Sequence, residues 1–512
     1  MNGYLRRLAT TGAAYTSSSV LSKLFAVALL PLYTQHLSPE DFGAAEVLTV
    51  AVIATAITIR LGLIEALMRF YYKAGEDPER VVKTSFAAMA IGAALAVAVA
   101  MPFAGPISEA LLDRSEPGLT RIAIGGIGVF VLYDLLLALF RLDERARAYF
   151  VYTISNILIT IPVTVWLVVV EDQGATGLLI GQFGVGALIT VALIAANWSR
   201  LSLIPERALL RRMLRFGLPT MPAELSLYSL SFIDRIMIVQ LVGLAEAGLY
   251  SLAVKFAQAV QVLVRGFQLA WSPLAYSITD DGEAKHAYAV IVTWFVAACS
   301  FVVMAMWLFS RWIVDFLAAP EFFDSYEAVG LVATGVMLYG LYFVLIVVIG
   351  RTGRTELSFP ATVTGMVSNV ILNLLLVPPL GIVGAGIALV ASYVLLLAVM
   401  YVFTQRLFTV PYEWGRLAQV AGIAVWLTVA VGRQQELPGD GGLAARIAVW
   451  LCYPALLWVT RFPDFDERRA IVAALSPRAL RERLRALRTG PQPAGAVPEA
   501  LEAEQRDEDA FR

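Results

Sequence analysis

Eight charged side chains interrupt stretches of sequence that are otherwise almost entirely apolar. A charge near the centre of a bilayer costs at least about 2.5–3.5 kcal/mol on insertion scales, so such a side chain normally faces a wet cavity or a partner. Arginine is especially suited to phosphate, because its planar guanidinium offers paired donors. The pattern therefore predicts a polar cavity that binds an anion. The eight residues are Lys23, Arg60, Asp134, Glu224, Asp234, Arg235, Lys255 and Arg265.

The charges fall on polar stripes when each apolar segment is treated as a helix at 100° per residue. Gln258, Gln261 and Arg265 share one face of one helix, and Glu224 and Arg235 share a face of the helix before it. Each stripe predicts one polar wall of a central cavity. The predicted substrate-binding residues are Lys23, Arg60, Arg235, Lys255, Arg265, Gln258 and Gln261.

The balance of charge on these walls indicates the sign of the ligand. Four of the cations have no obvious acid one turn away, so we expect a cavity with surplus positive charge. These four are Lys23, Arg60, Lys255 and Arg265. Three acids, Asp134, Glu224 and Asp234, are candidates to carry a coupling proton or sodium ion, and the sequence does not choose among them.

Structural roles compete with these functional ones. Asp234 and Arg235 could form a structural pair, and Asp134 could pair with Arg141 on its own helix. Lysines could instead extend toward the interface or bind a neighbouring helix end. A ridge at i, i+4 and i+8 is more typical of hydrogen bonds between helices than of a sugar site. That ridge consists of Asn156, Thr160 and Thr164.

The composition indicates a membrane protein and excludes several other classes. Of 512 residues, 59% are hydrophobic and 15% are charged, against about 25% charged in soluble domains. The two cysteines and two histidines are too few and too scattered for a disulfide framework, a zinc site or a histidine triad. We therefore expect no metal and no cofactor. We also expect no cleavable signal peptide and no nucleic-acid partner.

The apolar runs predict an all-α polytopic fold. A bilayer core of about 30 Å needs roughly 20 apolar residues per helix, which predicts about fourteen spans. They lie near 12–36, 42–68, 83–104, 119–141, 148–170, 175–198, 214–242, 246–276, 287–309, 327–350, 358–378, 383–404, 415–432 and 446–461.

The distribution of lysine and arginine predicts the orientation. One set of loops is rich in both, whereas the opposite set holds little beyond Arg114, Arg121, Arg311, Arg433 and Arg446. This asymmetry places both termini in the cytoplasm, with the protein multi-pass in the inner (plasma) membrane. Residues 476–488 then read as a basic amphipathic helix at the cytoplasmic surface, or as a solvated one, before a disordered end.

A weak internal repeat predicts two related halves. The segment LYTQHLSPEDFGAAEVLTVAV corresponds to IVQLVGLAEAGLYSLAVKFA at an offset of 205, which places Gly43 on Gly248 and Arg60 on Arg265. Parallel six-helix lobes facing each other would enclose a cleft. The predicted organisation is two six-helix lobes, two further transmembrane helices and a cytoplasmic tail, over residues 1–200, 201–410, 411–464 and 465–512.

The same segments carry a resemblance. LSPEDFGAAEV and FIDRIMIVQLVGLAEAGLYSLAVKF resemble the polysaccharide transporter family of the multidrug/oligosaccharidyl-lipid/polysaccharide exporter superfamily, over about residues 5–410. The resemblance implies a V-shaped fold of two lobes and flipping of polyprenyl-diphosphate-linked oligosaccharides to the outer leaflet. In similar lipid II flippases basic residues on spans one, two and eight hold the diphosphate, a role that would fall to Lys23, Arg60 and Arg265.

We therefore expect a flippase for surface polysaccharide biosynthesis that works by alternating access and breaks no covalent bond, so that it is not an enzyme. Its expected partners are the lipid-linked oligosaccharide, membrane lipid and a glycan polymerase or other biosynthesis proteins. One alternative is a cation-coupled exporter of organic cations, which would want acidic walls. A second is a membrane-embedded glycan polymerase or glycosyltransferase, which would need a large external loop or an acidic metal motif.

Overall fold

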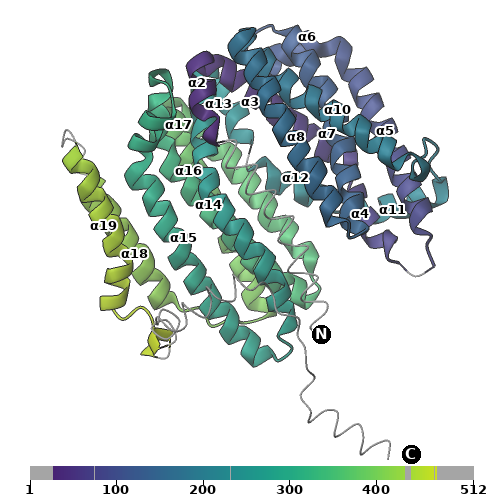
Figure 1. Ribbon diagram of the computed structural model, residues 1–512. Coiled ribbons are helices and arrows are strands. Elements are labelled where there is room, and N and C mark those ends of the chain that lie inside the picture. The colour runs from purple at the N-terminus through teal and green to yellow at the C-terminus, as the bar shows by residue number, and fades with distance from the viewer. Residues whose placement is uncertain (1–26, 74, 231, 433–439, 466, 470–512) are drawn as a thin grey trace, which may run out of the picture. The chain divides into compact units, whose positions relative to one another are not determined.

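A computed structural model describes residues 27–73, 75–230, 232–432, 440–465 and 467–469 (Figure 1). The described chain is built from helices. Those before residue 201 include α2 (Leu30–His36), α3 (Pro39–Arg60), α4 (Leu63–Tyr71), α5 (Pro78–Ala100), α6 (Ala104–Leu112), α7 (Pro117–Leu142), α8 (Ala146–Val165), α9 (Gly174–Leu179) and α10 (Val185–Asn197). Those after it include α11 (Arg207–Gly217), α12 (Met221–Ser229), α13 (Ile233–Val242), α14 (Leu244–Ser277), α15 (Asp281–Leu317), α16 (Tyr326–Thr352), α17 (Ser358–Leu407), α18 (Trp414–Gly432) and α19 (Asp440–Val459).

Within the described ranges, ten helices are long and apolar enough to cross a membrane, or eleven if the bent pair α12 and α13 counts as one span. The predicted class, an all-α polytopic membrane protein, is confirmed. Three differences account for the lower number of spans. Most of the first predicted span lies outside the described residues, and the apolar part of α18 is short. Helix α17 joins two predicted spans across Gly381, whose φ of 53° and ψ of −135° interrupt the helix.

Some predictions lie outside the described residues. They concern most of the first span, Lys23 and the amphipathic segment 476–488.

Local sequence explains where α3 begins and ends. The Ser38 hydroxyl accepts a hydrogen bond from the Asp41 backbone N–H, with Pro39 in the first turn, as at many helix N-termini. Leu61 and Gly62 then adopt left-handed conformations, with φ of 49° and 68°. The predicted span 42–68 is therefore broken into α3 and α4. The break places Arg60 at the C-terminal end of α3, where backbone carbonyls favour a cation.

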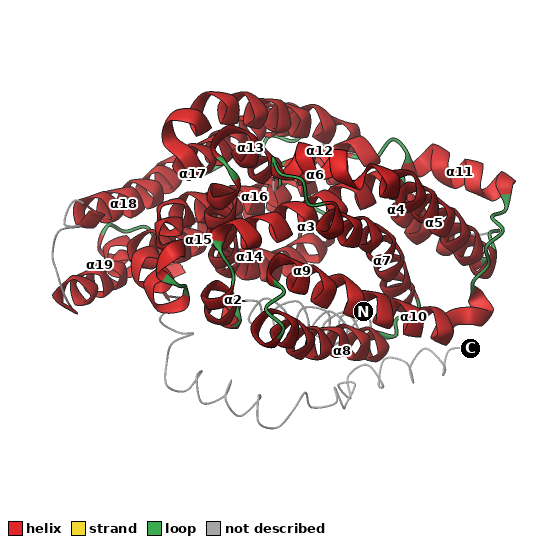
Figure 2. Cartoon of the chain, turned by 90° about the horizontal axis from the view of Figure 1, so that it is seen from above, coloured by secondary structure: helices red, strands yellow, loops and turns green. Residues whose placement is uncertain are grey.

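Helix α3 lies at the centre of the first half and packs against α7, α9 and α14 (Figure 2). Its contact with α14 joins the two members of the predicted repeat. Contacts divide the chain into two compact units, 1–450 and 451–512. The predicted boundaries at residues 200, 410 and 464 remain predictions.

Candidate functional site

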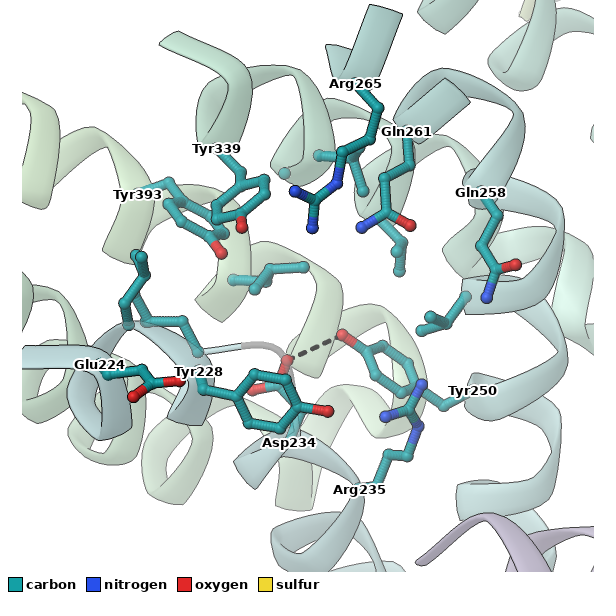
Figure 3. Close-up of a pocket in the computed structure, with 17 residues that line it drawn as sticks. Glu224, Tyr228, Asp234, Arg235, Tyr250, Gln258, Gln261, Arg265, Tyr339 and Tyr393 are labelled. Carbon is teal, nitrogen blue, oxygen red and sulfur yellow. Dashed lines mark hydrogen bonds between the residues drawn. The ribbon is translucent and has the colours of Figure 1, made fainter. Parts of the chain in front are cut away.

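A polar cavity of about 390 Å³ lies among α12, α13, α14, α16 and α17 (Figure 3). We call it the second-half cavity, because all its lining residues follow residue 200. Six predicted site residues meet there from three helices. They are Glu224 from α12, Asp234 and Arg235 from α13, and Gln258, Gln261 and Arg265 from α14.

Four tyrosines complete the polar lining, and none of them was among the predicted site residues. Tyr228, Tyr250, Tyr339 and Tyr393 all line the cavity. Tyr339 and Tyr393 come from α16 and α17, on stretches without a charged residue, so the pattern of charges does not indicate them. A tyrosine deep in an apolar span is nevertheless a signal, since its hydroxyl needs a polar partner.

Arg265 points into the cavity between Gln261 and Tyr339 (Figure 3). Its Nη1 donates a hydrogen bond to Gln268 Oε1 over 3.4 Å, and among the described residues it forms no ion pair. The guanidinium is therefore available to an anionic ligand.

Asp234 is held at the wall of the cavity by neutral groups. The residue is 2% exposed, and its carboxylate accepts hydrogen bonds from the Tyr250 hydroxyl (2.9 Å) and from Asn373 Nδ2 (2.8 Å). The Oδ1 atoms of Asn369 and Asn373 are also buried, and neither has a hydrogen-bond partner among the described residues. The carboxylate is therefore enclosed and hydrogen-bonded to neutral donors, and two amide oxygens of the same wall are left without a donor from the described part of the chain.

Arg60 does not line this cavity, and the expectation that it has no acidic partner is corrected. Its Nη1 lies 2.9 Å from Asp134 Oδ2, so Asp134 of α7 pairs with Arg60 and not with Arg141 of its own helix. The Arg60 side chain is 10% exposed, yet its Nε and Nη2 atoms have no partner among the described residues. These two atoms form one edge of the guanidinium, which leaves a paired set of donors free.

Arg60 nevertheless lies near the residues of α12 that reach the cavity. Glu224 is within electrostatic range of Arg60, Glu65 and Asp134, and Tyr228 is within range of Arg60. Helices α3 and α12 are in contact. Arg60 therefore approaches the second-half cavity from the first half of the chain.

Lys255 forms an ion pair with an acid too, so the same correction applies to it. Its Nζ lies 2.7 Å from Glu46 Oε1 on α3. Both residues line another cavity, of about 340 Å³, whose other walls come from α2, α3, α8, α9 and the π-helical segment Ile180–Gly184. We call it the first-half cavity. Asn156, Thr160 and Thr164 also line it.

Neither cavity therefore has the predicted surplus of positive charge. Two acids and two arginines line the second-half cavity, and one acid paired with one lysine lines the first-half cavity. The acids that balance the cations come from other helices, which spacing along one helix cannot detect.

Comparison with known proteins shows which family the chain matches and which solved structures share its fold. Residues 9–279, just over half of the chain, match the family model described as polysaccharide biosynthesis protein. A solved structure of the lipid II flippase MurJ in an inward closed conformation superposes with a TM-score of 0.69 at 12% identity, over 89% of this chain and 100% of that one. An inward-facing multidrug resistance MATE family transporter gives 0.63 at 15% identity, over 78% and 96%. At these identities the similarity shows the fold.

Curated relatives are similar over shorter stretches. An uncharacterized membrane protein of Methanocaldococcus jannaschii is 22% identical over 43% of this chain and 44% of its own length. A probable multidrug resistance protein, NorM, of Bacillus thuringiensis is 26% identical over 37% of this chain and 45% of its own. The chain thus spans less than half the length of each of these relatives.

Proposed function

Because the chain belongs to the polysaccharide biosynthesis protein family, we propose that it is a flippase, which moves a polyprenyl-diphosphate-linked oligosaccharide from the cytoplasmic to the outer leaflet of the inner membrane. The observation that carries the proposal is the pair of repeat-related arginines. Within the part of the chain that the structure describes, Arg60 has a free pair of buried donors, and Arg265 points into a polar cavity without an acidic partner. Arginine forks of this kind suit phosphate oxygens.

In this mechanism the diphosphate enters from the cytoplasmic side and binds Arg265 and the free edge of Arg60. Arg235 and the amides of Gln258 and Gln261 add donors from the wall of the same cavity. The prenyl chain stays in lipid. The two halves then rock about their contact so that the headgroup faces the other leaflet, and no covalent bond changes.

Asp234 is the best of the three acidic candidates for the coupling ion. A proton or sodium ion bound at its carboxylate would cancel one negative charge beside Arg235 and Arg265, and the cavity would then hold an anion more tightly. This coupling is reciprocal, because an anion in the cavity raises the affinity for the cation by the same factor. Asp134 forms its ion pair with Arg60, and Glu224 lines the cavity but also interacts with Glu65, Arg60 and Asp134.

Depletion of the protein tests the proposal. Lipid-linked oligosaccharide should accumulate in the inner leaflet, and the wild-type chain should restore its export. The double variant Arg60→Ala/Arg265→Ala should reach the membrane but fail to restore export. Arg354→Ala serves as the matched control, because Arg354 lies exposed between α16 and α17, outside both cavities. Full export by the double variant would reject the assignment.

Export of organic cations is the second candidate, and the charge balance is the observation that favours it. Glu224 and Asp234 put acids on the same wall as the arginines. A cation exporter would lose activity when these acids are neutralised and would tolerate loss of Arg265. The flippase requires the opposite result for Arg265.

A further inference from the structure

We propose that the first-half cavity is a separate binding site for an uncharged, hydroxyl-bearing group, namely a sugar residue of the lipid-linked glycan. The proposal rests on the proposed function, and it assigns to this cavity a ligand group that the arginines do not bind.

Unpartnered polar atoms inside the cavity are the first observation. Asn156 Oδ1 and Thr160 Oγ1 are enclosed, and neither has a hydrogen-bond partner among the described residues. Hydroxyls of other threonines within apolar helices, such as Thr190 and Thr293, donate to the carbonyl four residues earlier. Enclosed polar atoms are normally satisfied, so atoms left open in a cavity indicate a ligand or water. Hydrogen bonding between helices does not account for Asn156 Oδ1 or Thr160.

The charge of the first-half cavity does not suit either a diphosphate or an organic cation. Glu46 and Lys255 are its charged lining residues, and they neutralise each other at 2.7 Å. A diphosphate requires unpaired basic side chains, and an organic cation requires unpaired acidic ones. What remains is neutral: Tyr33, Thr164 and Gln182, with Asn156 and Thr160. Amides and hydroxyls both donate and accept, as sugar hydroxyls do.

The size and the apolar walls also suit a single sugar ring. A volume of about 340 Å³ lies near the lower end for ligand sites, which run from about 300 to 1,000 Å³. Phe42 and several aliphatic side chains could contact the C–H face of a ring while the polar ridge of α8 contacts its hydroxyls. The aliphatic lining residues are Leu29, Leu30, Ile157, Ile161 and Leu178.

Backbone irregularities adjoin the same cavity. The segments Trp166–Val170 and Ile180–Gly184 are π-helical, and such insertions are frequent at functional sites. Gln182 lies in the second one. Next to it, Gly181 packs against Thr164 so closely that a Cβ atom there would overlap the threonine hydroxyl and lie 2.8 Å from its Cβ.

The two cavities share helix α14, which suggests how one ligand could use both. Lys255 faces the first-half cavity, whereas Gln258, Gln261 and Arg265, further along the same helix, line the second-half cavity. Under this proposal the diphosphate binds at the arginines and a sugar binds in the first-half cavity.

Binding of two lipids to the full-length protein in nanodiscs tests the proposal. The probes are a polyprenyl diphosphate without sugar and the same lipid carrying one N-acetylhexosamine. Loss of two neutral hydrogen bonds in Asn156→Ala/Thr160→Val should weaken binding of the glycosylated lipid about tenfold and leave the sugar-free lipid unchanged. Arg265→Ala should weaken both.

The outcomes separate the two proposals. If neither lipid binds the wild type, the proposed function fails. If both bind wild type and the double variant alike, the sugar site is overturned while the diphosphate site stands. The sugar site is also overturned if the double variant binds both lipids more weakly by the same factor. Thr364→Val, on α17 outside both cavities, controls for loss of a membrane hydroxyl, and a thermal melt of each variant excludes misfolding.

Discussion

Gly43 of α3 and Gly248 of α14 pack backbone against backbone. A Cβ atom added to Gly43 would overlap the Leu244 carbonyl oxygen and lie 2.9 Å from the Gly248 nitrogen, and one added to Gly248 would overlap the Pro39 carbonyl. These glycines are equivalent positions of the predicted repeat. Each is followed after 17 residues by an arginine, Arg60 or Arg265, about 25 Å further along its helix. The halves therefore meet at equivalent points, and both arginines lie well away from that contact.

If the two halves rock about the contact between α3 and α14, both glycines should be required for that contact to close. Gly43→Ala or Gly248→Ala should insert normally yet lose most transport, because a methyl group forces the helices apart. Labelling of cysteines placed near the contact should show increased access from the outer side. Gly125→Ala is the control, since nothing lies within 4 Å of a Cβ there. Unchanged access in both glycine variants would contradict a gating role.

Asp134 should compete with the ligand for Arg60. Arg60→Ala should weaken binding of a polyprenyl diphosphate by about ten- to a hundredfold, as expected for loss of a hydrogen bond between charged groups. Asp134→Asn should instead strengthen binding, because it frees Arg60 Nη1. A titration of each variant and of the double variant measures the coupling. Weaker binding by Asp134→Asn would count against the competition.

Neutralising Asp234 should abolish the dependence of transport on a cation. Asp234→Asn keeps the size of the side chain but removes the charge that a proton or sodium ion would cancel. Tyr250→Phe removes one hydrogen bond to the carboxylate and should have a milder effect. Transport measured across gradients of sodium and of pH checks this. If transport by Asp234→Asn depends on the cation gradient as in the wild type, another acid couples the ion to transport.

The ion pair and hydrogen bond of Asp143 with Arg200 and Tyr71 should make the stability of the folded protein depend on pH. Burial alone would raise the pKa of Asp143, but hydrogen bonds from Arg200 (Nη2, 3.1 Å) and Tyr71 (2.7 Å) lower it below its ordinary value. The pKa is lower in the folded state, so the stabilisation is present above the unfolded pKa of about 3.9 and is lost as pH falls through the folded value.

Melting temperatures between pH 7 and pH 3 measure this contribution. Asp143→Asn should lower the melting temperature at pH 7 and flatten its fall at acidic pH. Glu171→Gln, an exposed acid after α8, should change neither. A parallel pH profile in Asp143→Asn and wild type would show that other carboxyls dominate.

Much of the architecture follows from local chemistry along the chain. The apolar composition and the length of the apolar runs require helices in lipid, because backbone groups there must be satisfied within a segment. The repeat, detected through Gly43 and Gly248, placed Arg60 and Arg265 at equivalent positions. Helical periodicity also grouped Gln258, Gln261 and Arg265 on one face, and these residues do line one cavity.

The partners of the charges depend on how the helices pack in space. Periodicity establishes which face of a helix a residue occupies, but not which helix comes to lie opposite that face. Glu46 therefore forms an ion pair with Lys255, and Asp134 forms one with Arg60. The partners of each pair are more than 70 residues apart in the sequence. Packing likewise brought Tyr339 and Tyr393 to Arg265 and Asn373 to Asp234. The charge and the polar lining of both cavities are accordingly properties of the packed helices.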